Sequence, residues 1–187
     1  MYEVEIKVRV KNIKDTHDLL QKLSPTLVEE VSYYDTYFDN ELREFTNEEK
    51  ELRVREITNG KKKVILTFKD NPFDKSTKSK PEFEVSLDNR NAAVEIFTRL
   101  GYVVDITLIK KCMNYYFEFE KKHVLGTMVR IQELESTFLE LEIMVERVEK
   151  IEEAKNTLNL ILSYLNISKS DITSEYYTDL VRNARKS

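Results

Sequence analysis

The chain has 187 residues, of which 41% are hydrophobic and 34% are charged, so it can build one domain with a substantial core. The charged share exceeds the usual share of about a quarter, so the excess must lie on the surface or in a polar interior. A net charge of −4, a single cysteine and three glycines argue against bulk attraction to nucleic acid, an internal disulfide and a glycine-rich phosphate loop.

The first predicted element is a strand over residues 2–10, in which apolar and charged residues alternate. Val4 and Ile6 belong to one face of this strand, and Glu3 and Glu5 belong to the other. The N-terminus is charged from its third residue and contains no long apolar run, so we expect neither a signal peptide nor a membrane-spanning helix. We therefore predict a cytoplasmic protein that has neither nucleic acid nor membrane as a partner.

Further strands are predicted from alternation and from β-branched and aromatic content. In chain order they are expected over residues 32–39, 51–57, 63–69, 81–87, 108–119, 128–134 and 138–145. The stretch 70–79 is polar and is predicted to be a loop.

Helices are expected over residues 12–23, 89–100, 151–165 and 174–184. The second should begin at Asp88 or Asn89, which are good N-cap residues, and end at Gly101. The third carries apolar residues at three- and four-residue steps, which is typical of a helix packed on one face.

Several strands carry charges on the face opposite their apolar residues. These are Glu3, Glu5, Lys7, Arg53, Arg55, Lys69, Glu82, Glu84, Lys110, Arg130, Glu140 and Glu142. For any single strand, a solvated face explains the charges. If the sheet closes into a barrel, however, one face must point inward. The amphipathic helices need an apolar partner surface, which favours a charged interior with helices packed on the outside.

An interior lined by both signs of charge needs a ligand, because buried charges are costly unless they are paired or coordinated. Carboxylates suit Mg²⁺ or Mn²⁺, and clustered lysine and arginine side chains suit phosphate oxygens. Together they favour a complex of a metal ion with a polyphosphate.

Short motifs along nearly the whole chain add a family resemblance. Glu3-x-Glu5-x-Lys7 resembles the N-terminal signature of the CYTH superfamily, also called triphosphate tunnel metalloenzymes, which includes class IV adenylyl cyclases and thiamine triphosphatases. Similar family segments are found at Asp35–Asp39, Leu52–Arg55, Leu66–Lys69, Glu82–Glu84, Leu100–Tyr102, Lys110, Phe138–Glu142 and Tyr177–Leu180.

The resemblance implies an α+β fold in which one domain, over residues 1–187, forms an antiparallel eight-stranded β-barrel with a charged tunnel. It also implies a homodimer and a triphosphate-bearing small molecule as partner. The implied metal ligands are Glu3, Glu5, Glu140 and Glu142, and the implied phosphate-binding residues are Lys7, Arg53, Arg55, Lys69 and Lys110. We add Arg130, on the same charged face, as a phosphate contact, with an internal ion pair as its alternative.

This sequence departs from the family pattern at several positions. Cys112 stands where the sixth strand usually has an arginine, and Gln132 stands where the seventh usually has an aspartate. Lys80-Pro81 replaces the arginine before the fifth-strand glutamates, and residues 135–137 make a shorter turn than usual. These departures leave metal and phosphate binding intact as predictions and weigh against chemistry that is specific for a nucleoside.

We therefore predict metal-dependent hydrolysis of tripolyphosphate or a small organic triphosphate. Positioning and charge neutralisation by Lys7 and the other cations would supply much of the catalysis. Glu3 or Glu5 would be the base, and the sequence does not choose between them. The first alternative is a class IV adenylyl cyclase that makes cyclic AMP and pyrophosphate from ATP. The second is a polyphosphate-binding module without turnover.

Overall fold

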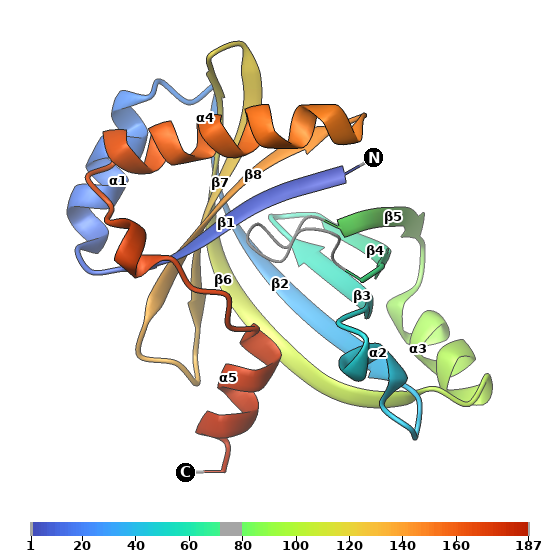
Figure 1. Ribbon diagram of the computed structural model, residues 1–187. Helices are drawn as coiled ribbons and strands as arrows, with labels where there is room; N and C mark the ends of the chain where they lie inside the picture. The colour runs from blue at the N-terminus through green and yellow to red at the C-terminus, as the bar shows by residue number, and fades with distance from the viewer. Residues whose placement is uncertain (1, 72–79, 187) are drawn as a thin grey trace.

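Eight antiparallel strands close into a barrel in the computed structural model, which describes residues 2–71 and 80–186 (Figure 1). Around the barrel the strands follow the order β1-β5-β4-β3-β2-β6-β7-β8. This confirms the predicted α+β fold with an eight-stranded barrel. Most of the predicted loop at 70–79 lies outside the described residues. The strands are β1 (Tyr2–Val10), β2 (Leu27–Asp39), β3 (Glu51–Thr58), β4 (Lys62–Lys69), β5 (Lys80–Leu87), β6 (Val103–Phe119), β7 (Lys122–Ile131) and β8 (Thr137–Val145).

The described part of the chain also contains five α-helices and two short 3₁₀ turns. The α-helices are α1 (Ile13–Lys22), α2 (Glu44–Asn47), α3 (Arg90–Arg99), α4 (Ile151–Tyr164) and α5 (Tyr177–Ala184), and the 3₁₀ turns are η1 (Val148–Lys150) and η2 (Lys169–Asp171). No helix among the described residues combines the length and the apolar character that a membrane crossing requires.

The predicted helix boundaries depend on local capping, and the structure confirms them at α1 and α3. The side chain of Asn12 accepts a hydrogen bond from the backbone N–H of Asp15, and Asn89 accepts one from Ala92. Gly101 has a φ of +94°, the left-handed conformation that commonly follows the end of a helix.

The strands β2 and β6 are longer than the sequence predicted. They pair along almost their whole length, from Leu27 opposite Tyr116 to Asp39 opposite Val103. Val103 and Val104 are exposed, so the beginning of β6 has no buried face to produce a regular alternation. A register shift between Tyr37 and Phe38 interrupts the pairing of these two long strands.

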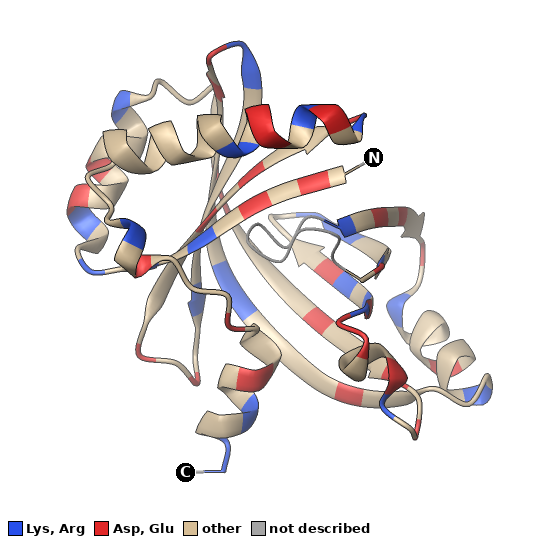
Figure 2. Cartoon of the chain, in the orientation of Figure 1, with Lys and Arg blue, Asp and Glu red and all other residues tan. Residues whose placement is uncertain are grey.

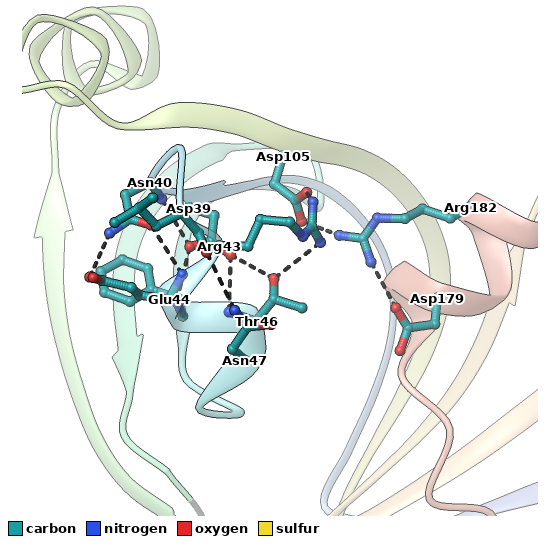
Figure 3. Close-up of polar contacts among 11 residues, drawn as sticks. Asp39, Asn40, Arg43, Glu44, Thr46, Asn47, Asp105, Asp179 and Arg182 are labelled. Atoms are coloured by element: carbon teal, nitrogen blue, oxygen red, sulfur yellow. Dashed lines mark hydrogen bonds and ion pairs between the residues drawn. The ribbon is translucent and has the colours of Figure 1, made fainter.

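The short helix α2 was not predicted, because it is fixed by one buried side chain rather than by a periodic pattern. Figure 3 shows Asp39, at the end of β2, beside this helix. The Asp39 carboxylate accepts hydrogen bonds from the backbone N–H groups of Asn40, Phe45 and Thr46 and from the Thr46 hydroxyl. These bonds hold the chain in its turn between β2 and β3.

The main apolar core lies outside the barrel wall, where helices cover the outward faces of the strands. The helix α4 lies across β1 and β8 (Figure 1). Leu158 and Ile161 of α4 pack in the same buried cluster as Val4, Leu139 and Leu141. The helix α3 covers β3 in the same way. The apolar faces therefore point to the helices, and the opposite faces of the strands enclose the interior.

The helix α5 lies against β6 at one end of the barrel (Figure 1). Tyr177 and Val181 of α5 pack with inward-facing apolar residues, including Leu108, Val129 and Phe138. This end of the interior is therefore apolar, and the charged part of the interior begins beside Tyr177.

Candidate functional site

The inward-facing residues of all eight strands, with the start of α5, line a cavity of about 520 Å³. Charged residues of both signs recur along the strands (Figure 2). The charged residues in the cavity wall are Glu3, Glu5, Lys7, Glu51, Arg53, Arg55, Lys69, Lys80, Glu82, Glu84, Lys110, Glu140 and Glu142.

The two signs are partly separated around the cavity, and the strand order explains why. The neighbouring strands β8, β1 and β5 carry six of the seven carboxylates, with Lys7 and Lys80 among them, whereas β4, β3 and β6 carry Lys69, Arg53, Arg55 and Lys110, with Glu51 among them. The cavity therefore has an acidic side and a basic side. A ligand between them must present positive charge to one side and negative charge to the other.

On the basic side, Asp35 orients two of the cations. This side chain is fully buried on β2, opposite Arg55 of β3. Arg55 donates from Nε and Nη2 to the two Asp35 oxygens at 2.6 and 2.7 Å, and Lys110 Nζ lies 3.5 Å from the same carboxylate. Among the described residues, Nη1 of Arg55 makes no hydrogen bond, which leaves it available for a ligand.

The pKa of Asp35 shows how strongly these charges act. Burial alone would raise the pKa, but the positive charges of Arg55, Lys110 and Arg53 outweigh burial and hold it below its ordinary value. Asp35 is therefore ionised at neutral pH and stays paired. This pairing offsets part of the cost of burying two cations in the barrel wall.

Arg53 lies next to this group with an unsatisfied donor. Its Nη1 lies 3.3 Å from Glu51, and its Nη2 is 3.4 Å from the Thr67 hydroxyl. Its Nε is buried and has no hydrogen-bond partner among the described residues. A buried cationic N–H without an acceptor is costly, and a phosphate oxygen would satisfy it.

On the acidic side, two carboxylates face each other across neighbouring strands. Glu5 of β1 is directly opposite Glu142 of β8, and Lys7 is opposite Glu140. Burial raises the pKa of Glu5 to about 7, and the nearby charges of Glu140 and Glu3 add to the increase. Burial also raises the pKa of Glu142 well above its ordinary value. Opposed like charges destabilise a sheet, so this pair favours a cation or a bound proton.

Lys69 connects the two sides of the cavity. It forms an ion pair with Glu3, and its Nζ lies 3.6 Å from Glu82. Burial would raise the pKa of Glu3, but the charge of Lys69 and its hydrogen bond lower it overall. Glu3 is therefore ionised and engaged with Lys69.

The acidic side offers only oxygen donors, which are the ligands that Mg²⁺ and Mn²⁺ prefer. The chemistry of Glu3, Glu5, Glu140 and Glu142 thus fits the predicted metal. As the side chains are arranged, however, no three acidic, histidine or cysteine side chains in the described part of the chain are grouped closely enough to hold a metal ion. Metal binding at these residues therefore requires side-chain rotation, for example release of Glu3 from Lys69.

Arg130 is the one predicted site residue that the structure keeps away from the cavity. On β7 the residues that line the cavity are Leu125 and Thr127, and Arg130 belongs to the opposite face. It is exposed, lies opposite Lys111 of β6, and borders a groove on the outside of the barrel beside α1. The prediction that Arg130 contacts phosphate is therefore not supported by its position.

This placement gives a direct test of the basic side. Replacing Arg53 with glutamine should weaken tripolyphosphate binding by about tenfold or more, because a bidentate charged donor is lost. Replacing Arg130 with glutamine should change the affinity by less than about twofold, because its side chain lies outside the barrel. Isothermal titration calorimetry checks both, and a large loss in the Arg130 variant would contradict the assignment of the inner face.

The sequence did not identify several residues that line the cavity or lie behind its wall as site residues. Asp35 and Glu51 support the cations, and Tyr177 contributes an aromatic ring. Asp35 had one available signal, its position in the family-like segment 35–39. Its partners Arg55 and Lys110 lie on other strands, so only the register of those strands reveals its role.

The sequence model of the CYTH domain family matches residues 1–177 of this chain. The chain belongs to the CYTH family. Its relatives include a Methanocaldococcus jannaschii protein, provisionally named an adenylate cyclase, which is 28% identical over 96% of this chain and 98% of that protein. A Pyrococcus horikoshii structure matches with a TM-score of 0.84 and 25% identity, over 97% of this chain and 98% of that one.

A Hippeastrum protein shares the fold at 18% identity, with a TM-score of 0.68 over 97% of this chain and 95% of that one. It is described as a candidate adenylyl cyclase with a dominant triphosphatase activity. The comparisons thus give one sequence relative named as an adenylate cyclase and one protein of the same fold described as having a dominant triphosphatase activity.

Proposed function

We propose that this CYTH protein hydrolyses a triphosphate, either inorganic tripolyphosphate or a small organic triphosphate, with Mg²⁺ or Mn²⁺ as cofactor. The observation that carries the proposal is the division of one cavity into an acidic side and a basic side. A triphosphate alone would satisfy only the basic side. A triphosphate with a bound divalent cation presents negative oxygens to one side and positive charge to the other.

In the proposed reaction, a water oxygen attacks the terminal phosphorus, and the bond from that phosphorus to the bridging oxygen breaks with its electrons going to the leaving group. Arg53, Arg55 and Lys110 hold phosphate oxygens and offset the charge that develops on them. When bound at the glutamates, the metal ion supplies further charge neutralisation and polarises phosphate oxygens.

Glu5 is our preferred base for the proton released by the attacking water. Glu3 is occupied by its ion pair with Lys69. Glu5 lines the cavity and forms no ion pair among the described residues. Its carboxylate is therefore the freer of the two to accept a proton or to bind metal.

Cyclisation of ATP is the second candidate. The Methanocaldococcus jannaschii relative that carries an adenylate cyclase name covers almost the whole chain. A groove of about 910 Å³, bounded by the β6–β7 turn and the start of α4, shares Tyr116, Leu125, Glu142 and Met144 with the charged cavity. A nucleoside joined to a triphosphate in the cavity would have room there.

A substrate and metal screen separates these functions. The protein should release phosphate from tripolyphosphate with Mg²⁺ or Mn²⁺, and the screen should include pyrophosphate, ATP and thiamine triphosphate, each also with Ca²⁺. Cyclic AMP and pyrophosphate formed from ATP, without triphosphate hydrolysis, would identify a cyclase instead. Tight binding of tripolyphosphate without any turnover would identify a binding module.

A further inference from the structure

Tyr177 lies where the charged cavity meets the apolar end of the barrel. It is the first residue of α5, it is 6% exposed, and it lines the cavity. The centre of its ring is 4.4 Å from Lys7 Nζ and 4.5 Å from Lys110 Nζ. One aromatic ring therefore contacts two lysines that come from different strands. The family resemblance implies phosphate binding for both, and our proposed function uses Lys110 in that role.

Tyr177 is held in this place by contacts farther along α5. Figure 3 shows Arg182 directed toward Asp105 of β6 and toward Asp179. Arg182 forms ion pairs with both carboxylates, and Asp105 also pairs with Arg43 at 3.1 Å. Asp105 thus joins α5 to the turn after β2, and this anchor fixes the start of α5 at the end of the barrel.

We propose that Tyr177 is a positioning residue that holds Lys7 and Lys110 in the geometry that receives the triphosphate, and that the Asp105–Arg182 anchor holds Tyr177 in turn. This proposal rests on the proposed function of the cavity. An ammonium group is attracted to the face of an aromatic ring. Lysine has a long, flexible side chain, and holding it in place before binding reduces the entropy lost when phosphate binds.

The ring of Tyr177, rather than its hydroxyl group, carries this role. The hydroxyl is buried near Glu140 but makes no hydrogen bond of ordinary geometry with the described residues. Both lysines, in contrast, lie at cation–π distance from the ring. A phenylalanine at this position keeps the ring and removes only the hydroxyl, whereas a leucine removes both.

The test measures tripolyphosphate binding by calorimetry in EDTA, so it requires neither metal nor turnover. Tyr177→Phe should bind within about twofold of the wild type, and Tyr177→Leu should bind about tenfold more weakly. In a double-mutant cycle with Lys110→Met, the fold-loss in affinity of the double variant should be smaller than the product of the fold-losses of the two single variants. Equal binding by Tyr177→Leu and the wild type, equal weakening by both Tyr177 variants, or independent losses in the cycle would overturn the role of the ring.

A second pair of variants tests the anchor without entering the cavity, and it serves if Tyr177→Leu does not fold. Asp105→Asn should weaken binding about threefold, because Arg182 loses the charge of its less exposed partner. Asp179→Asn is the matched control, since it removes only the exposed partner of Arg182 and should bind like the wild type. Wild-type affinity in Asp105→Asn would overturn the anchor.

Different results would overturn the proposed function and the role of Tyr177. If the wild type binds tripolyphosphate but hydrolyses no triphosphate, the proposed hydrolysis is wrong and the binding series still tests Tyr177. If the wild type does not bind tripolyphosphate, then Lys7 and Lys110 are not its ligands and both proposals are wrong.

Discussion

Replacing Glu5 with glutamine should abolish metal-dependent phosphate release from tripolyphosphate, with a loss of about a hundredfold or more. Glutamine keeps the shape of the side chain but cannot accept the proton of the attacking water, and it is a weaker ligand for a divalent cation. The measurement is the initial rate of phosphate release at saturating Mn²⁺. Binding of tripolyphosphate in EDTA should remain, because the cations of the basic side are unchanged.

The stability of this variant gives a second, independent result. Glu5 is directly opposite Glu142, and both carboxyl groups are enclosed by the barrel. Removing one of two opposed charges should leave the thermal stability of the metal-free protein equal or higher. A matched control is Glu56→Gln, whose side chain pairs with Lys62 away from the cavity and should not affect the rate. Wild-type turnover in Glu5→Gln would show that Glu5 is neither base nor essential metal ligand.

The strands β1 and β8 could be predicted from the sequence because their two faces differ strongly, whereas closure of the sheet into an eight-stranded barrel was implied by the family resemblance. Val4 and Leu139 are buried under α4, while Glu5 and Glu142 point into the interior. Both faces are under constraint, so the alternation persists along each strand. At the start of β6 this constraint is absent, and the exposed Val103 gives no signal of where the strand begins.

The position of Arg130 on the outer face has a related explanation. The cavity-facing residues of β7 are Leu125 and Thr127, which are uncharged, and the charged residue lies on the outer face. A rule that assigns charges to the interior therefore selects the wrong face of this strand.

The division into acidic and basic sides could not be predicted from the sequence order. It depends on β1 lying between β5 and β8, and these strands are distant from β1 along the chain. For the same reason Asp35 was not predicted as a site residue. Its importance comes from the pairing of β2 with β3 and β6, which brings Arg55 and Lys110 to one carboxylate.

Replacing Asp35 with asparagine should lower the free energy of unfolding by about 3–5 kcal/mol, which is the usual consequence of removing one partner from a buried ion pair. Asp35 is fully buried, and its loss leaves Arg55 and Lys110 in the barrel wall without their counter-charge. Urea denaturation at pH 7 measures the effect. The control is Asp18→Asn on α1, an exposed partner of Lys14 whose removal should leave the urea midpoint unchanged.

The pH dependence of stability identifies the same carboxylate. The pKa of Asp35 is lower in the folded protein than in the unfolded chain, so its contribution is present above about pH 4 and is lost as the pH falls through the folded value. The groups that face Asp35 are Arg55, Lys110, Arg53 and Tyr37. All of them keep their protons as the pH falls below about 4, so the change in this range comes from Asp35 itself. Stability below pH 4 should therefore fall less steeply in Asp35→Asn than in the wild type.

Tripolyphosphate binding by Asp35→Asn, measured by calorimetry beside these two stability measurements, decides what Asp35 does for the ligand site. If Asp35 only neutralises charge, an asparagine that keeps one hydrogen bond to Arg55 should lose stability and still bind tripolyphosphate normally. If it also fixes the direction of Arg55, binding should weaken as well, because the guanidinium group of this cavity-lining residue is no longer held by two bonds. The bidentate contact favours the second result, since two bonds fix the plane of the guanidinium group. A variant as stable as the wild type would contradict both accounts.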